Sequence, residues 1–277
     1  MDLNTPEVEA IIALALQEDV RTGDITGQAT IPADLRCSAV ILAKAPGVVA
    51  GVEVVRAVFR ALDPDVHVET LVADGTPIVP PLDLVTLEGP ARSVLAGERT
   101  ALNLLGRMCG IATLTRTYVD AIAGTGARIL DTRKTMPGMR ILDKYAVACG
   151  GGVNHRMGLY DAFLIKDNHL QVAGGVTAAV ALARAAHPDR SITVEVENLD
   201  QLREAVSCNT DRIMLDNMSA DLMRQAVAIV GGRAEVEASG GITLDTIREV
   251  ALTGVDVISV GALTHSAKWL DVSMEVS

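Results

Sequence analysis

From about residue 124 onward, short apolar runs alternate with amphipathic segments. The strand candidates are RILD, AFLIK, TVEVEN, RIMLD, EVEAS and VISVG, and helical stripes lie near 140–149, 176–187, 199–207, 219–230 and 243–253. Regular alternation of this kind predicts an α/β arrangement of parallel strands, either a barrel or a doubly wound sheet.

The first hundred residues follow a different pattern. Thr5 and Pro6 read as an N-cap and first helical residue before an apolar stripe. The strand candidates SAVILA, VHVETLVA and DLVTLEG follow, with a helix near 52–62, and no regular βα repeat is present. We therefore expect a small α+β domain. A long helical pattern over 98–123 comes next, and we expect it to be broken or kinked near Gly106 and Gly110.

Polar or glycine residues follow every strand of the alternating region. In order, the strand ends carry Asp131-Thr132-Arg133-Lys134, Lys166-Asp167-Asn168-His169, Glu195 and Glu197, Asp216-Asn217, Ser239-Gly240-Gly241, and Gly261. Any one of these could simply cap the next helix. Six in succession favour a barrel, whose strands all present their carboxyl ends on one catalytic face, over an open sheet with a single switch point.

Charge is distributed unevenly along the chain. The formal net charge is −11, yet residues 128–166 hold seven Lys or Arg and only three Asp or Glu. The acidic balance argues against nucleic acid as a partner. A cationic segment within an anionic protein indicates a focused site for a small anion.

The candidate chemistry is that of a site for phosphate and carboxylate groups. Glycines in EASGGIT (237–243) and SVGALT (259–264) would let a phosphate approach backbone N–H groups, although both stretches could be ordinary helix-entry turns. The loop GGGVNHRMG carries His155 and Arg156, which can reach anionic groups. Glu195, Glu197 and Asp216 could hold Mg²⁺ or sugar hydroxyls, or one of the two Glu could pair with a nearby Lys.

Composition indicates where in the cell the protein is located. Cys37, Cys109, Cys149 and Cys208 are scattered and read as reduced thiols. No apolar run reaches membrane-span length, and MDLNTPEVEA does not resemble a secretory signal. We expect a cytoplasmic protein with no membrane partner.

Several long motifs resemble one family. AGERTALNLLGRMCGIATLTRTYVDA, ARILDTRKTMPGMRILDKYAV, CGGGVNHRMGLYDAFLIKDNH, VEVEN, IMLDNM and EASGGI are similar to nicotinate-nucleotide pyrophosphorylases (carboxylating), the quinolinate phosphoribosyltransferases, over about residues 10–272. The resemblance implies an N-terminal α/β domain over 1–104, to which 265–277 return. It also implies an incomplete, seven-stranded type of TIM-like α/β barrel over 105–264 that carries the active site.

The resemblance also implies an activity. Quinolinate and phosphoribosyl pyrophosphate would give nicotinate mononucleotide, pyrophosphate and CO₂ with Mg²⁺, a pentosyl transfer of de novo NAD biosynthesis. The implied cationic pocket for quinolinate and part of the pyrophosphate consists of Arg133, Lys134, His155, Arg156 and Lys166, and Thr132 would also bind substrate. Glu195 and Asp216 would bind ribose hydroxyls and metal, and the 5-phosphate would lie at Ser239, Gly240, Gly241 and Gly261. Lys134, Glu195 and Asp216 would be the catalytic residues. Arg99 would complete the site of the partner subunit in a homodimer or a higher oligomer.

Three other readings compete with this one. A molybdenum-transport accessory protein of the same fold shares most of the motifs, and a nicotinate phosphoribosyltransferase would need fewer cations. A non-catalytic phospho-metabolite binding protein would need the phosphate cradle alone. Met136, Met139 and Tyr160 are departures near the pocket that could tune substrate fit.

Overall fold

The computed structural model describes residues 2–277 and divides into two compact units. Unit 1 combines the chain up to Arg116 with Thr135–Gly151 and Leu263–Ser277. Unit 2 comprises Thr117–Lys134 and Gly152–Ala262. The helix near 140–149 thus falls in unit 1, within the range that the sequence assigns to the barrel domain. The division at 104/105 stays a prediction.

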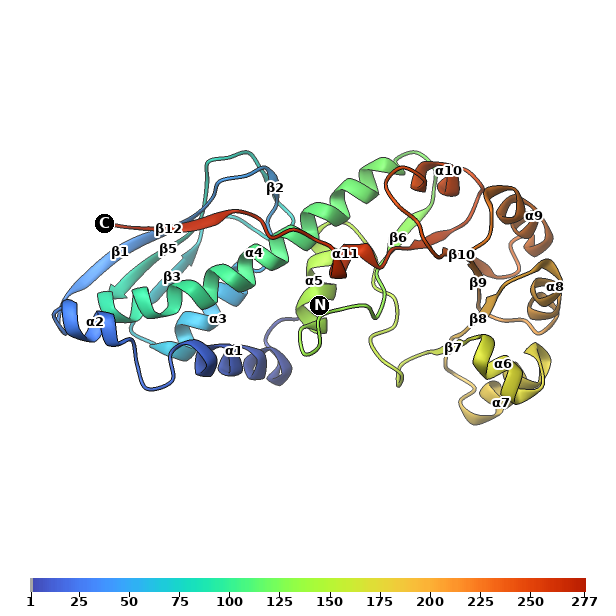
Figure 1. Cartoon of the computed structure of the whole chain (residues 1–277), viewed down its shortest axis with the longest axis horizontal. Helices are drawn as coiled ribbons and strands as arrows, with labels where there is room; N and C mark the ends of the chain where they lie inside the picture. Colours follow the sequence, from blue (N-terminus) through green and yellow to red (C-terminus); the bar gives the residue numbers. More distant parts are fainter. Residues whose placement is uncertain (1) are drawn as a thin grey trace. The chain divides into compact units, whose positions relative to one another are not determined.

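Unit 1 is built on an antiparallel sheet in the order β12-β1-β5-β3 (Figure 1). The four strands are β12 (Val272–Val276), β1 (Arg36–Ala43), β5 (Leu82–Pro90) and β3 (His67–Thr70), and β2 (Gly47–Val48) pairs with β4 (Pro77–Ile78). Its helices are α1 (Pro6–Asp19), α2 (Ile25–Thr30), α3 (Val52–Leu62) and α5 (Arg140–Cys149). The α+β prediction and the C-terminal return to this sheet agree with these elements, and the Thr5 side chain caps α1 by accepting from Val8 N–H.

The long helix α4 (Ala91–Ala121) is continuous, so a break at its glycines is wrong, whereas a kink there stays a prediction. The helix begins seven residues earlier than the expected residue 98. The glycines serve close packing instead. A Cβ on Gly110 would overlap the carbonyl oxygen of Lys268, and one on Gly106 would lie 3.0 Å from that of Leu270. Leu270 N–H donates to Gly106 O at 2.9 Å, so the C-terminal segment passes directly over the helix backbone.

Unit 2 is an incomplete parallel barrel, as expected (Figure 1). Its strand order is β6-β11-β10-β9-β8-β7: β6 (Arg128–Leu130), β11 (Val257–Ser259), β10 (Glu235–Ser239), β9 (Arg212–Asp216), β8 (Ile192–Val196) and β7 (Phe163–Ile165). Six strands are present, and beside β6 a single parallel bridge between Leu130 and Val153 marks the place of a seventh. The connecting helices are α6 (Asp167–Ala173), α7 (Val176–Ala186), α8 (Leu199–Ser207), α9 (Ala220–Val230) and α10 (Ile247–Ala251), and α11 (Ala262–His265) follows β11.

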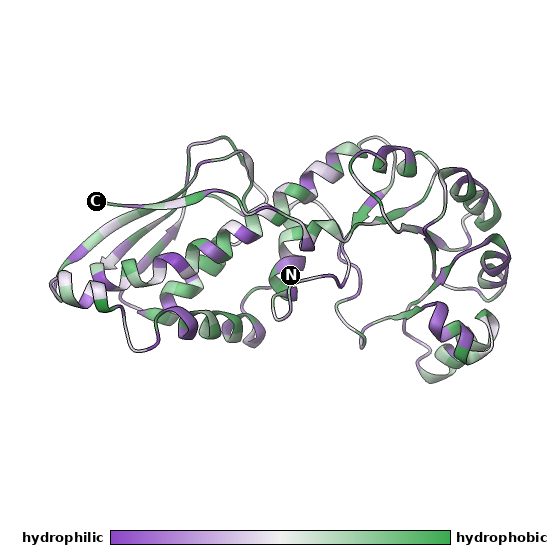
Figure 2. Cartoon of the chain, viewed as in Figure 1, coloured by the Kyte–Doolittle hydropathy of each residue, from purple (hydrophilic) through white to green (hydrophobic). Residues whose placement is uncertain are grey.

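The two faces of this sheet differ in chemistry. One face is apolar and fully buried against the helices, with Val194, Val196, Ile213, Leu215 and Ala238 at zero exposure. The other face carries Thr193, Glu195, Arg212, Asp216, Glu235, Glu237 and Ser239. Because alternate residues of a strand face opposite sides, each strand supplies both the core and a polar barrel interior. Figure 2 shows the matching pattern on the helices, which carry both hydrophobic and hydrophilic residues.

No helix within residues 2–277 has the combination of length and apolarity that crossing a membrane requires.

Candidate active site

Strand register brings the polar interior residues of unit 2 into layers. Glu195 on β8 and Glu237 on β10 both pair with Met214 on β9, and Asp216 pairs with Ser239 one layer closer to the carboxyl ends. Paired residues of parallel strands point to the same side of the sheet. The predicted residues Glu195, Asp216 and Ser239 therefore lie on one face of three adjacent strands.

Glu195 faces a cation and a second carboxylate. Lys166 Nζ lies 3.3 Å from Glu195 Oε2, with the lysine half-exposed and the glutamate largely buried. Burial raises the pKa of Glu195, Lys166 partly offsets this, and Asp216 raises the pKa further. The sequence left open whether a glutamate here pairs with lysine or waits for a ligand. In the structure Glu195 pairs with Lys166, and the negative charge of Asp216 also acts on Glu195.

The loop after β6 begins with a buried carboxylate. Asp131 is fully buried, and its two oxygens accept from Asn154 Nδ2 at 2.6 Å and from His155 N–H at 2.8 Å. Thr132 Oγ1 accepts from Lys134 N–H at 3.0 Å, which closes a tight turn. Asp131 thus anchors the loop, and Arg133 and Lys134 follow it as exposed side chains.

His155 and Arg156 are held firmly by the protein. His155 Nδ1 accepts from Arg156 N–H at 2.7 Å, and Arg156 Nη1 donates to Ala162 O at 3.0 Å. Burial and the positive charge of Arg133 lower the pKa of Arg156, and Asp161 only partly compensates. Two guanidinium groups therefore lie close enough to repel each other, an arrangement that an anion between them would relieve.

The glycine pair after β10 adopts a conformation that other residues avoid. Gly240 has φ 98° and Gly241 has φ 59°. A Cβ on Gly240 would overlap Oδ1 of Asn217, whereas nothing lies within 4 Å of the Cβ position of Gly241. Gly241 thus leaves open space for a ligand. The expected helix N-terminus is not at this place, because α10 begins only at Ile247. Gly261 immediately precedes α11, which has only four residues.

Arg99 lies on α4 in unit 1, with its side chain exposed. Its predicted role in a partner's site stays a prediction.

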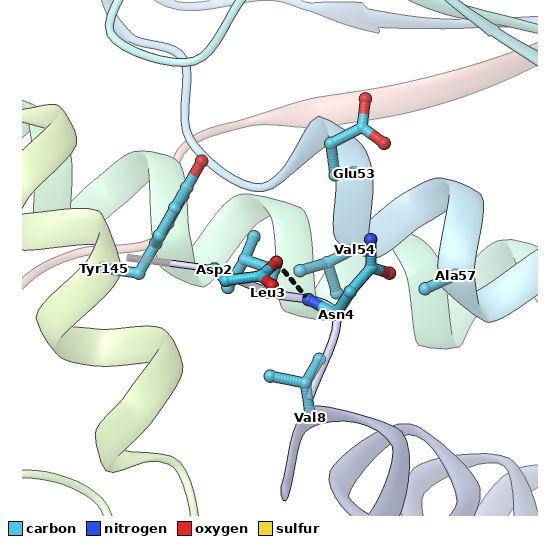
Figure 3. A pocket seen from close by; sticks show the side chains of 8 residues that line it. All are labelled: Asp2, Leu3, Asn4, Val8, Glu53, Val54, Ala57 and Tyr145. Atoms are coloured by element: carbon cyan, nitrogen blue, oxygen red, sulfur yellow. Dashed lines mark hydrogen bonds between the residues drawn. The ribbon is translucent and has the colours of Figure 1, made fainter. Parts of the chain in front are cut away.

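The pocket shown in Figure 3 lies within unit 1 and has different chemistry. It measures about 220 Å³ and is lined by Asp2, Leu3, Asn4, Val8, Glu53, Val54, Ala57 and Tyr145. Its charged lining residues, among those the structure describes, are both acidic. An anionic substrate is therefore poorly matched to it.

Comparison with known proteins agrees with the motifs. The family models for the quinolinate phosphoribosyl transferase N-terminal and C-terminal domains match residues 24–109 and 111–275. The chain belongs to the quinolinate phosphoribosyl transferase family.

Relatives cover nearly all of this family member. A probable nicotinate-nucleotide pyrophosphorylase [carboxylating] of Bacillus subtilis is 42% identical over 99% of this chain and 95% of its own length. A chloroplastic nicotinate-nucleotide pyrophosphorylase [carboxylating] of Oryza sativa is 43% identical over 98% of this chain and 78% of its own. The crystal structure of NadC from Streptococcus pyogenes superposes with a TM-score of 0.96 at 39% identity, covering 100% of this chain and 99% of that one.

This family member offers only part of the ligand set of a divalent metal ion. Among residues 2–277 no three His, Cys, Asp or Glu side chains gather as a metal site. Glu195 and Asp216 offer carboxylate oxygens on adjacent strands. This set fits Mg²⁺, which commonly takes one or two carboxylates and completes its shell with substrate phosphates and water.

Sequence reasoning missed the residues that hold the site together. Asp131 and Asn217 contact the predicted residues His155 and Asp216, and Asn154 donates to Asp131. Glu237 is a fully buried carboxylate beside His155. One signal was available for Glu237. Glu237 shares a strand face with Glu235 and Ser239, so strand alternation predicts that its charged side chain points into the barrel.

Proposed function

We propose that the chain catalyses the decarboxylating quinolinate phosphoribosyl transfer at the carboxyl ends of the unit 2 strands. Quinolinate and phosphoribosyl pyrophosphate give nicotinate mononucleotide, pyrophosphate and CO₂, a step of NAD biosynthesis. Two observations in unit 2 carry this site: the guanidinium groups of Arg133 and Arg156 repel each other, and Lys166 pairs with Glu195 beside Asp216. A dicarboxylate between the cations would neutralise them.

Each residue class has a task in this reaction. Arg133, Arg156 and Lys166 orient quinolinate, His155 supports Arg156, and Thr132 and Lys134 contact the pyrophosphate. Fixed cations hold the ring nitrogen near C1 of the ribose, and positioning alone can supply several kcal/mol. Ser239, Gly240, Gly241 and Gly261 receive the 5-phosphate, for which the open space at Gly241 leaves room.

The bonds change in two steps. The ring nitrogen lone pair forms a bond to C1 of the ribose, and the C1–O bond breaks with its electrons on pyrophosphate. Lys134 stabilises the negative charge that develops there. The bond to the adjacent carboxylate then breaks, CO₂ leaves, and the ring carbon takes a proton from water. The alkylated nitrogen is the electron sink for this step.

Glu195 and Asp216 would hold Mg²⁺ together with the substrate. When bound, the ion neutralises pyrophosphate charge. The two carboxylates also suit the ribose hydroxyls, because ionised carboxylates are strong hydrogen-bond acceptors. Lys166 favours the charged form of Glu195 and so keeps it available as a ligand.

The test is a product balance. With Mg²⁺, phosphoribosyl pyrophosphate and quinolinate, the purified chain should release CO₂ and pyrophosphate in equal amounts. Pyrophosphate release with nicotinate but not with quinolinate would overturn the proposal. Arg133→Ala should abolish turnover while the circular dichroism spectrum stays unchanged.

A homodimer, in which Arg99 completes the partner's site, is part of the proposal. An exposed arginine on α4 is available for such a role. Mixing inactive Arg99→Ala and Lys134→Ala proteins should restore up to about a quarter of the activity for random subunit exchange, because one site per hybrid would be intact. No recovery after verified exchange would refute a shared site. A cytoplasmic location fits the four free cysteines, which a reducing compartment maintains.

A further inference from the structure

Glu237 is a fully buried carboxylate in the middle of β10, and the reaction described above gives it no task. Burying a charge is costly unless hydrogen bonds and an opposite charge compensate. Three groups from three different segments do so. Ser259 Oγ on β11 donates to Oε1, Arg212 Nη1 on β9 donates to Oε2 at 3.3 Å, and His155 Nε2 lies 3.4 Å from Oε2.

The charges around Glu237 form an alternating chain. Arg128 pairs with Glu235, Glu235 accepts from Arg212 Nε at 2.6 Å, and Arg212 in turn reaches Glu237. Two guanidinium groups balance two carboxylates, so the chain is neutral before its last contact, His155. It runs from Arg128, which is 54% exposed, to a histidine side chain that is 9% exposed.

Both ring nitrogens of His155 face the protein. Nδ1 accepts from Arg156 N–H at 2.7 Å, so Nδ1 carries no proton in this arrangement. The proton of the neutral ring is then on Nε2, which points at Glu237. The ring therefore links a buried anion to the backbone of Arg156.

We propose that Glu237 is a positioning residue. It fixes the His155 ring with the proton on Nε2 and, through Nδ1, holds Arg156 in place against the repulsion of Arg133. The inference rests on the proposed function for the assignment of Arg156 to quinolinate. Without this support, repulsion would move Arg156 away from Arg133. A planar dicarboxylate requires both cations at a fixed spacing.

The substitution Glu237→Gln tests the contact with little change in volume. All three groups that meet the carboxylate are donors, whereas glutamine offers one acceptor oxygen and an NH₂ group that is itself a donor. One donor must then face another, and the His155 contact is the longest of the three. Glu235→Gln is the matched control, because Glu235 lies on the same strand face and also binds Arg212 but does not touch His155.

Steady-state kinetics should separate positioning from a merely structural role. Glu237→Gln should raise the KM for quinolinate roughly ten- to a hundredfold, the range for loss of one contact with a buried charge. Its KM for phosphoribosyl pyrophosphate should stay within about twofold, and Glu235→Gln should leave both values within about twofold. Equal rises in both KM values, or the same pattern in both variants, would overturn the proposal.

A second measurement needs neither substrate nor a folded variant at position 237. Nitrogen NMR of the full-length chain distinguishes the two neutral ring forms, and His155 is one of only five histidines, identified by the signal lost in His155→Asn. We expect the Nε2–H form in the wild type. An Nδ1–H form would overturn the proposal, including when Glu237→Gln fails to fold. A wild type with the expected ring form but no turnover of quinolinate would instead refute the proposed function.

Discussion

Replacing Arg107 by methionine would leave the buried carboxylate of Asp143 without its cation. Arg107 Nε donates to Asp143 Oδ1 at 2.9 Å and Nη2 donates to Oδ2 at 2.8 Å, a bidentate pair. The Asp143 side chain has no exposed surface and the Arg107 side chain is only 12% exposed. Asp143 also accepts from Met136 N–H at 3.2 Å, and so holds the chain just after the Arg133-Lys134 loop.

The expected loss follows from that burial. Breaking a buried pair by removing one partner costs about 3–5 kcal/mol, because the remaining charge is desolvated without compensation. One neutral hydrogen bond, from Met136, returns only about 1 kcal/mol. We therefore expect Arg107→Met to lower the free energy of unfolding by about 2–4 kcal/mol. The double variant Arg107→Met/Asp143→Leu should recover most of this loss, because no charge is left buried.

Urea denaturation followed by the fluorescence of Trp269 is the assay. Trp269 is the only tryptophan in the chain, and it lies in unit 1 with both partners. Arg56→Met, also in unit 1, is the control, because its pair with Glu53 is exposed and should change stability by less than about 0.5 kcal/mol. A loss in Arg107→Met no larger than in Arg56→Met would refute the desolvation argument, as would a double variant less stable than the single one.

Two further predictions concern a glycine and a thiol. Gly240→Ala should raise the KM for phosphoribosyl pyrophosphate by tenfold or more, because the new Cβ would overlap Asn217, whose side chain donates to Asp216. Gly232→Ala is the control, because Gly232 also has a positive φ but nothing lies within 4 Å of its Cβ position. It should leave that KM unchanged. Burial raises the pKa of Cys109 from 9.0 to about 12. Between these two pH values the folded chain retains a thiol proton that the unfolded chain loses. The contribution of the thiol to stability is therefore full below pH 9 and is lost as the pH rises toward 12. The stability gap between wild type and Cys109→Ala should therefore shrink by about 1.4 kcal/mol between pH 7 and pH 10 in urea titrations, and a constant gap would contradict the shift.

Local patterns were sufficient where a segment's structure depends on its own residues. The helix at 52–62 and the strand of EVEAS lie where periodicity put them, because an amphipathic stripe or an alternating run specifies both the element and its buried face. The same rule failed for α4. Gly106 and Gly110 read as helix breakers, and only the passage of residues 268–270 over the helix shows that they are contact points.

The site divides in the same way. Its charged and glycine positions could be predicted, because they stand at strand ends, and the carboxyl ends of parallel strands meet on one face. Their supporting partners could not. Asp131 meets Asn154 and His155 from 23 and 24 residues away, and Glu237 meets His155 across 82 positions.

The sequence by itself determined the alternation of strands and helices, the cationic segment and the family. These follow from residue type and spacing along the chain. Only the tertiary structure decided which carboxylates could serve as the proposed ligands and which are enclosed by donors, because Glu195, Asp216 and Glu237 are chemically alike. What separates them is burial and register: one layer of the barrel keeps Glu195 beside Lys166 and Asp216, while three donors enclose Glu237 completely.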